Sequence, residues 1–250
     1  MNKLIFNNLS VGYSNKTIIE NINLEVDKGK FIAILGENGA GKSTLLHSIL
    51  GIINSLKGEI LLDKKNIKSI QSTDLALEIA AVFSKLESVP QVKVKDLIQI
   101  GNVRNFTPKK TNESQLLSLA KSIGIENLLP KFANELSEGQ MQLVMIARAL
   151  HQNTAFVLMD EPTANLDLGN QYSIFELIKN LKNLTAKTFL MATHEVDLAL
   201  QFADEIWWIE NGKLHAGIPE EIAFEHQIMK KISNHILHFD ATQDQFTVTQ

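Results

Sequence analysis

The chain contains no cysteine, and its 250 residues include only two tryptophans and two tyrosines. The absence of cysteine excludes disulfide bonds, thiol nucleophiles and zinc sites built on thiolates, and it fits a reducing compartment. Long hydrophobic runs are also missing. The longest strictly apolar stretches, such as residues 31–35 and 155–159, are far below the roughly 20 residues that a membrane span needs. The first residues turn polar before a signal-peptide core could form.

An excess of positive charge is absent too. The 24 Lys and Arg against 28 Asp and Glu give a formal net charge of −4, which argues against a protein that grips nucleic acid with its whole surface. What is present is an ordinary globular composition, 44% hydrophobic and 21% charged, in a length that fits one or two domains. We therefore expect a cytoplasmic protein that serves any membrane process from outside the bilayer.

The order of apolar patterns predicts an α/β protein. Apolar residues alternate with polar ones at Ile18, Ile22, Leu24 and Val26, and the apolar run 31–35 suits a strand buried on both faces. A helix at 43–51 and a strand at 58–62 follow, and residues 94–150 then have a helical character. After this helical insertion we expect strands and helices in alternation, at 156–160, 170–181, 187–193 and 196–203. This order implies a mainly parallel sheet with helices on both faces.

A hairpin should close this pattern, because Asn211-Gly212 is a typical tight-turn pair. Trp207 and Trp208 precede the turn on neighbouring strand positions and must point to opposite faces, so we expect at least one of them in the core. After about residue 225 the sequence shows no regular pattern.

A glycine-rich loop between the strand at 31–35 and the helix at 43–51 matches the pattern G-x-x-x-x-G-K-[ST]. Its glycines let successive backbone N–H groups converge on phosphate oxygens, and the helix that follows points its positive end at the same anion. The lysine would reach the β- and γ-phosphates, and the serine hydroxyl would be a Mg²⁺ ligand. The sequence thus predicts a nucleoside triphosphate site formed by Gly36, Glu37, Asn38, Gly39, Ala40, Gly41, Lys42, Ser43 and Thr44.

Two acids, Asp160 and Glu161, end the apolar strand at 156–160. Because ligands of parallel sheets bind at the carboxyl ends of the strands, both acids should face the phosphate loop. Asp160 would hold Mg²⁺ directly or through water, which leaves Glu161 to polarise the attacking water.

A third motif, Leu136-Ser137-Glu138-Gly139-Gln140, resembles the LSGGQ signature of the ATP-binding cassette (ABC) ATPases, with Glu at the third position. Other landmarks of this family follow in the expected order. Tyr13 matches the aromatic residue that stacks on adenine, Asn165-Leu166-Asp167 resembles the D-loop, and His194 resembles the switch histidine. The resemblance extends over about residues 4–222.

This resemblance implies one ABC ATPase domain with a P-loop NTPase (RecA-like) core at about 1–85 and 151–222, which contains an N-terminal antiparallel β subdomain. A helical subdomain would cover about 86–150 and a C-terminal tail 223–250. It also implies a head-to-tail dimer that encloses two ATP molecules. Residues Ser137, Gly139 and Gln140 of one copy would meet the γ-phosphate held by the other, where His194 would orient the water with Glu161.

The sequence departs from the family at one position. A glutamine that usually touches Mg²⁺ at the end of the strand before the helical insertion is replaced here by Lys85, or by Ser84 if the register differs by one. A charged lysine cannot coordinate a cation. Either Glu87 or another group substitutes, or coupling to the membrane partner is tuned differently; Gln91 lies several residues too far along. The Mg²⁺ assignment therefore rests on Ser43 and Asp160 alone.

The segment 94–105 resembles one found in the iron–siderophore, haem and cobalamin importers, with Asn102 in place of the usual arginine and Arg104 as its replacement. We therefore expect the ATPase subunit of an importer, peripheral on the inner face of the membrane, with a separate permease and indirectly an extracytoplasmic binding protein as partners. An iron chelate or related metal complex is the expected cargo. Two alternatives are a soluble ABC ATPase of iron–sulfur cluster assembly and a nucleotide-gated scaffold with little hydrolysis.

Two further features carry less weight. The lysines between residues 57 and 68 are better explained as a solvated face than as an acidic-partner site. His235, His238 and Asp240 have a spacing that could ligate a metal, but they fall in the irregular tail.

Overall fold

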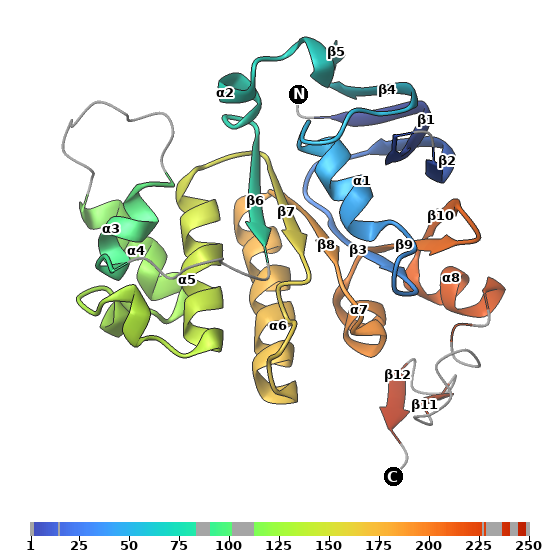
Figure 1. Cartoon of the computed structure of the whole chain (residues 1–250). Helices are drawn as coiled ribbons and strands as arrows, with labels where there is room; N and C mark the ends of the chain where they lie inside the picture. Colours follow the sequence, from blue (N-terminus) through green and yellow to red (C-terminus); the bar gives the residue numbers. More distant parts are fainter. Residues whose placement is uncertain are drawn as a thin grey trace.

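The computed structural model describes residues 3–14, 16–83, 91–101, 113–226, 228, 237–240 and 245–248. Figure 1 shows two sheets that pack together on one side of the molecule and a group of helices on the other. None of the helices in these ranges is long and apolar enough to cross a lipid bilayer.

Among the described residues, the larger sheet has six strands in the order β10-β9-β3-β8-β7-β6, and the edge strand β10 runs antiparallel to β9 while the other pairs are parallel. The predicted parallel sheet is therefore confirmed. The strands are β3 (Phe31–Gly36), β6 (Ile79–Phe83), β7 (Phe156–Asp160), β8 (Thr188–Ala192), β9 (Glu205–Glu210) and β10 (Lys213–Gly217).

Both faces of this sheet are covered. On one face, α5 (Glu138–His151), α6 (Leu168–Thr185), α7 (Val196–Phe202) and α8 (Pro219–Glu225) share a core with Phe31 and Leu35. On the other face, α1 (Lys42–Ile49) and the smaller sheet pack on Ile32 and Ile34. Trp207 belongs to the second core and Trp208 to the first, and both are buried. The two tryptophans thus do point to opposite faces, and both contribute to packing.

The smaller sheet is antiparallel in the order β2-β1-β4-β5. Its strands are β1 (Leu4–Tyr13), β2 (Lys16–Val26), β4 (Lys57–Leu62) and β5 (Lys65–Asn66). The alternation expected along β2 is partly wrong. Ile19 is fully buried and Ile18 only partly, because the register shifts near Asn21, whose φ of 55° marks an irregular residue in the strand.

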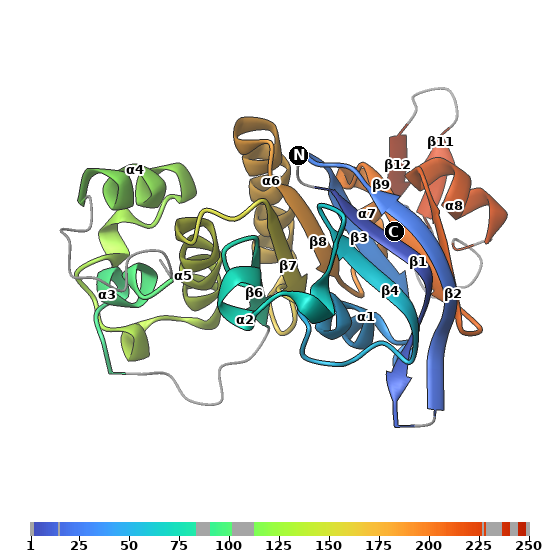
Figure 2. The same cartoon turned by 90° about the horizontal axis from the view of Figure 1, so that it is seen from above.

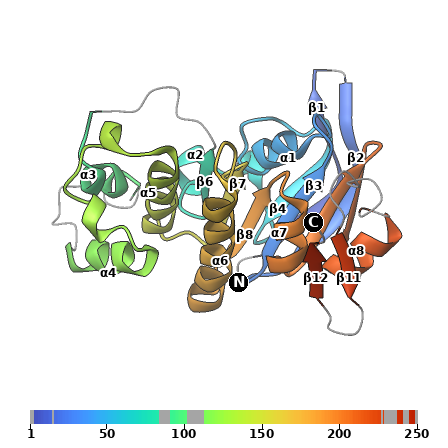
Figure 3. The ribbon, with the colours of Figure 1, turned by 90° about the horizontal axis from the view of Figure 1, so that it is seen from below.

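The helical insertion lies on the β6 side of the larger sheet, with α5 between the sheet and the other helices (Figures 2 and 3). It contains α3 (Val94–Gln99), α4 (Glu113–Ile123) and short 3-10 turns at Glu126–Leu128 and Ala133–Glu135. The helices expected at 43–51, 170–181 and 196–203 are present as α1, α6 and α7. Four elements were not expected: the single turn α2 (Ser72–Leu75) before β6, the helix α8, and an antiparallel pair in the tail, β11 (Leu237–Asp240) and β12 (Gln245–Val248).

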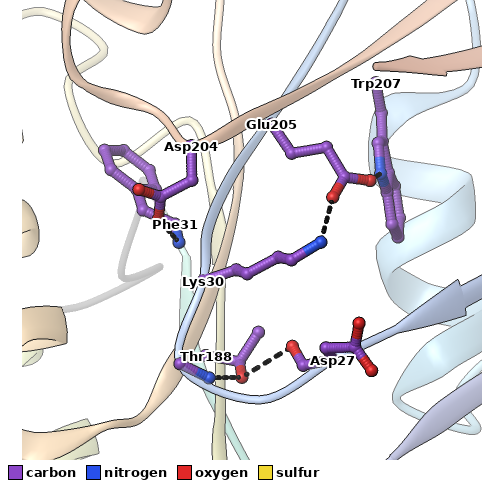
Figure 4. A network of polar contacts seen from close by, with 8 residues as sticks. Asp27, Lys30, Phe31, Thr188, Asp204, Glu205 and Trp207 are labelled. Atoms are coloured by element: carbon purple, nitrogen blue, oxygen red, sulfur yellow. Dashed lines mark hydrogen bonds and ion pairs between the residues drawn. The ribbon is translucent and has the colours of Figure 1, made fainter. Parts of the chain in front are cut away.

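A network of polar contacts joins the starting ends of β3, β8 and β9 (Figure 4). The Asp204 carboxylate accepts hydrogen bonds from the Phe31 backbone N–H (2.7 Å) and from Lys182 Nζ (3.0 Å). Glu205 accepts one from Lys30 Nζ (2.8 Å) and one from the Trp207 indole N–H (2.9 Å). We call this group the amino-edge network. The candidate site lies at the opposite edge of the sheet, where the parallel strands end.

Candidate functional site

The phosphate loop connects β3 to α1 at the carboxyl edge of the larger sheet. Its conformation depends on glycine at two positions in particular. Gly36 has φ 152° and a Cβ there would lie 2.6 Å from the Ile209 carbonyl oxygen, while Gly41 has φ 108° and a Cβ would lie 2.6 Å from Ile18 Cγ2. Any larger residue would force the loop outward. The curled loop therefore has the shape that turns backbone N–H groups toward an anion.

Lys42 is the first residue of α1, and only 4% of its surface is exposed. Its Nζ donates to the carbonyl oxygens of Gly36 (2.9 Å) and Glu37 (3.3 Å), so the ammonium lies inside the loop. Burial lowers the pKa of Lys42, and the nearby carboxylates of Glu161 and Asp160 oppose that shift. A positive charge with so little solvent is a good partner for a phosphate group.

Ser43 and Asp160 meet across the loop, since Ser43 Oγ donates to Asp160 Oδ1 at 2.9 Å. Burial raises the pKa of Asp160, and the hydrogen bond from Ser43 and the charge of His47 only partly oppose this rise. His47 Nε2 lies 3.9 Å from the other Asp160 oxygen. The hydroxyl and the carboxylate are hard oxygen donors of the kind that Mg²⁺ uses together with substrate phosphates, so the residues present fit that ion.

Glu161 and His194 form a second pair beside the first. His194 Nε2 lies 2.6 Å from Glu161 Oε1, and His194 Nδ1 lies 3.5 Å from Lys42 Nζ. Both contacts fit an imidazole that carries its proton on Nε2, accepts from Lys42 at Nδ1 and donates to Glu161. Glu161 has a φ of 50°, a strained value for this residue type, and its N–H donates to the Ala192 carbonyl (2.9 Å).

The signature residues lie elsewhere on the surface of the same chain. Ser137 is the N-cap of α5: its hydroxyl accepts from the Gln140 N–H (3.3 Å), and the Gln140 side chain accepts from the Ser137 N–H (3.2 Å). Ser137 is exposed and Gly139 partly so. No contact described between residues of this structure joins them to Lys42, so the site within one chain lacks them.

The other expected site residues are more scattered. Asp167 caps α6 by accepting from the Asn170 N–H (2.9 Å). Tyr13, half exposed, lies at the tip of β1. Thr44 is buried in α1. Glu37, Asn38, Gly39 and Ala40 line a hollow of about 270 Å³ together with the end of β9.

Ser84, Lys85, Glu87, Asn102, Arg104 and His235 lie outside the described residues, as do the side chains of His238 and Asp240. Gln91 is described and is exposed. What replaces the usual glutamine therefore stays a prediction.

Sequence analysis missed three residues near the site. His47 is one helical turn after Ser43, a spacing that places both on one face of α1 and could have revealed it. Gln171 and Glu195 form a hydrogen bond behind His194, and nothing in the sequence links two residues so far apart.

A phosphate loop and a pair of acids at the carboxyl edge of a parallel sheet define a P-loop nucleoside triphosphatase. The family model described as ABC transporter matches residues 19–164, more than half of the chain, and the chain therefore belongs to that family. Proteins of this family bind and hydrolyse ATP.

Individual relatives agree. An ABC transporter ATP-binding protein of Methanocaldococcus jannaschii, MJ0873, is 35% identical over 86% of this chain and 76% of its own length. The achromobactin transport ATP-binding protein CbrD of Dickeya dadantii is 32% identical over 90% and 86%. Among solved structures, cbiO1 of Clostridium perfringens, part of the ABC transporter complex cbiONQ, matches with a TM-score of 0.81 and 29% identity over 92% and 94%.

Proposed function

We propose that this chain is the ATPase subunit of an ABC importer and powers uptake through a separate membrane permease. The observation that carries the proposal is the convergence of two pairs, Ser43 with Asp160 and Glu161 with His194, around the buried ammonium of Lys42. One pair suits a magnesium ion and the other suits a water molecule. A machine that couples ATP hydrolysis to movement needs both next to the phosphates.

In this proposal the loop 36–41 and Lys42 cradle the phosphates of ATP, Thr44 supports the start of α1, and Tyr13 stacks on adenine. Ser43 and Asp160 would hold Mg²⁺, which would neutralise part of the charge of the phosphates. Burial of Asp160 leaves its charge poorly compensated, and a cation would compensate it. The same feature supports the choice of Asp160 over Glu161 as the metal ligand.

Glu161 acts as the general base. The water oxygen attacks the γ-phosphorus, the bond to the oxygen bridging the β- and γ-phosphates breaks, and Glu161 takes the proton of the water. His194 contacts the γ-phosphate and orients the water together with Glu161. The short contact between the two side chains supports this division of labour.

The complete site requires a second copy of the chain. Ser137, Gly139 and Gln140 of the partner subunit are proposed to meet the γ-phosphate from the far side, where the start of α5 presents N–H groups to an anion. Asp167 lies in the loop that faces the partner. The exposure of Ser137, and the lack of any contact between it and Lys42 among the described residues, support an arrangement in which these residues act in trans.

The assignment of a permease partner and a cargo is based on similarity to importer proteins and not on the geometry of the ATP site. We propose a core at about 1–85 and 151–222, a helical subdomain at about 86–150 that docks on the permease at the inner face of the membrane, and a tail at 223–250. Support comes from α3, in the segment that resembles one of the iron–siderophore, haem and cobalamin importers, and from a relative named for achromobactin transport. A siderophore or related metal complex is the proposed cargo.

A pull-down tests this proposal. Tagged Glu161→Gln protein is incubated with ATP and detergent-solubilised native membranes, and bound partners are identified by mass, with Lys42→Ala protein as the control that cannot retain nucleotide. A stoichiometric multi-span protein, recovered with Glu161→Gln and lost with Lys42→Ala, is the expected result. Recovery of soluble partners alone would overturn the importer assignment in favour of iron–sulfur cluster assembly.

A further inference from the structure

Gln171 and Glu195 form a partly buried hydrogen bond between two segments that each lead to the proposed ATP site. Gln171 lies in the first turns of α6 and is 8% exposed, and Glu195 is the N-cap of α7. Gln171 Nε2 donates to Glu195 Oε1 at 2.9 Å. The two residues belong to neither the phosphate loop nor the two pairs described above.

The Gln171 end of this bond leads to the D-loop. The Gln171 N–H donates to the Asp167 carbonyl (2.9 Å), within the first turn of the helix that Asp167 caps. Tight turns connect that loop back to β7, with bonds from the Ala164 N–H to the Glu161 carbonyl (3.1 Å) and from the Leu166 N–H to Thr163 (3.2 Å). The loop between Glu161 and Gln171 is thus held at both ends.

The Glu195 end leads to the switch histidine, which is the residue before it. The Glu195 N–H donates to Thr193 Oγ1 (3.1 Å), and its carbonyl accepts from the Ala199 N–H (2.9 Å). His194 in turn contacts Glu161 at 2.6 Å. The contacts therefore close a ring that runs from Glu161 through the D-loop and Gln171 to Glu195 and back through His194.

Stability alone does not account for a glutamine at this position. Gln171 Oε1 is buried and has no hydrogen-bond partner among the described residues, which costs free energy. Burial also raises the pKa of Glu195, and the charge of His194 and the Gln171 amide only oppose that shift. A methionine would fill the same space without an orphaned oxygen. The pair is therefore a candidate for a functional contact.

We propose that Gln171 is a positioning residue for ATP hydrolysis: through Glu195 it fixes His194 against Glu161, and it makes the position of His194 depend on the D-loop. This inference rests on the roles proposed above for Glu161 and His194. In the dimer, a partner subunit that presses on the loop at Asp167 would shift α6, and the hydrogen bond would pass that shift to the switch histidine. Closure of the dimer and assembly of the hydrolytic pair would then occur together.

Substitutions at both ends of the bond test the proposal. Gln171→Met removes the bond at nearly constant volume, and we expect kcat to fall roughly tenfold with the KM for ATP within about twofold, because misplacement affects the chemical step more than binding. Gln171→Glu places two carboxylates together and should cost at least as much. Combining it with Glu195→Gln restores an amide facing a carboxylate, and kcat should recover to within about threefold of the wild-type value.

Gln152→Met is the matched control. The Gln152 side chain also joins two segments, since it donates to the carbonyls of Ala76 and Ile79, but these contacts lie at the start of β6, whereas the ring of contacts lies at the carboxyl edge of the sheet. This variant should lose thermal stability and keep its kcat. An unchanged kcat in Gln171→Met, or an exchanged pair that folds stably and stays slow, would overturn the proposal.

A spectroscopic readout separates this inference from the proposed function. In protein labelled with ¹⁵N-histidine, the ring signals of His194 are assigned with a His194→Gln variant. They should move in Gln171→Met and stay in place in Gln152→Met, with or without turnover. Unchanged chemical shifts of the His194 ring in Gln171→Met would rule out the positioning role even if the chain hydrolyses ATP. Moved signals in a chain without ATPase activity would uphold it and reject the proposed function instead.

Discussion

Polar side chains gather at both edges of the larger sheet, and the surrounding contacts differ between the two edges. At the amino edge, Asp204 accepts two hydrogen bonds and Glu205 accepts two more, from donors that lie in three separate segments. At the carboxyl edge, burial raises the pKa of Asp160, and Glu161 has a φ of 50°. Hydrogen bonds thus compensate the carboxylates of the amino edge. The carboxyl edge has a carboxylate whose charge burial disfavours and a residue with a strained backbone.

This difference indicates that the amino edge contributes mainly to stability and the carboxyl edge mainly to activity. Hydrogen bonds at the amino edge tie β3 to β9 and thereby hold the strands in register. At the carboxyl edge, burial lowers the pKa of Lys42 and raises the pKa of Asp160, as is common where a ligand completes the arrangement. Substitutions at the two edges should therefore separate activity from stability.

The largest effect is expected for Glu161→Gln. Loss of the general base should reduce kcat by about a hundredfold or more, equivalent to about 2.7 kcal/mol in the barrier, while ATP still binds. The free energy of unfolding should change by less than about 0.5 kcal/mol, because an amide of the same shape replaces the carboxylate. Single-turnover hydrolysis and urea denaturation measure the two quantities. Unchanged turnover would remove Glu161 from the role of base.

The opposite separation is expected for Asp204→Ala. It leaves the buried N–H of Phe31 without its acceptor and should lower the free energy of unfolding by about 2 kcal/mol. Activity per folded molecule should stay at the wild-type level. Asp204→Asn, which keeps an acceptor oxygen, is the control and should lose only part of that stability in the same urea titrations. An Asp204→Ala protein that is fully stable but inactive would contradict the comparison.

Most of the carboxyl edge could be predicted from the sequence, because its residues are specified by local patterns. The loop ending in Lys42 and the acids Asp160 and Glu161 each follow an apolar strand, and parallel strands end at a common edge. The two cores, with Trp207 and Trp208 on opposite faces, follow from the same alternation.

The amino-edge network could not be predicted in this way. Lys30 and Glu205 are brought together only by the pairing of β3 with β9, which no local pattern encodes. The same holds for Gln171 and Glu195. Along β2 the alternation failed for another reason: the irregular residue Asn21 turns Ile19 rather than Ile18 into the core. The sequence therefore did not reveal two kinds of feature: contacts between segments far apart in the chain, and local irregularities within a strand.

A smaller effect of opposite sign is expected for Asp160→Asn. Because folding raises the pKa of Asp160, the folded state disfavours its charged form, and the substitution should stabilise the protein by up to about 1 kcal/mol near neutral pH. The gain should be full above the raised pKa and disappear below the unfolded value of 3.8. Urea denaturation across this range measures it, with exposed Asp63→Asn as the control. A loss of stability at neutral pH would show that Asp160 is better compensated than its burial indicates.

The smallest effect distinguishes two lysines at opposite edges of the larger sheet, Lys30 before β3 and Lys42 at the start of α1. The hydrogen bond to Glu205 raises the pKa of Lys30, so its stabilisation is fully present below 10.5 and is lost as the pH rises through the folded-state pKa. Because Lys30 is partly exposed, Lys30→Met should cost only about 0.5 kcal/mol at pH 8. Burial lowers the pKa of Lys42, so Lys42→Met should give no such loss, and any gain should vanish as the pH rises past 10.5. Urea denaturation of both variants between pH 8 and strongly alkaline conditions should show a loss of stability for Lys30→Met alone, and an equal loss in Lys42→Met would contradict the distinction between the two edges.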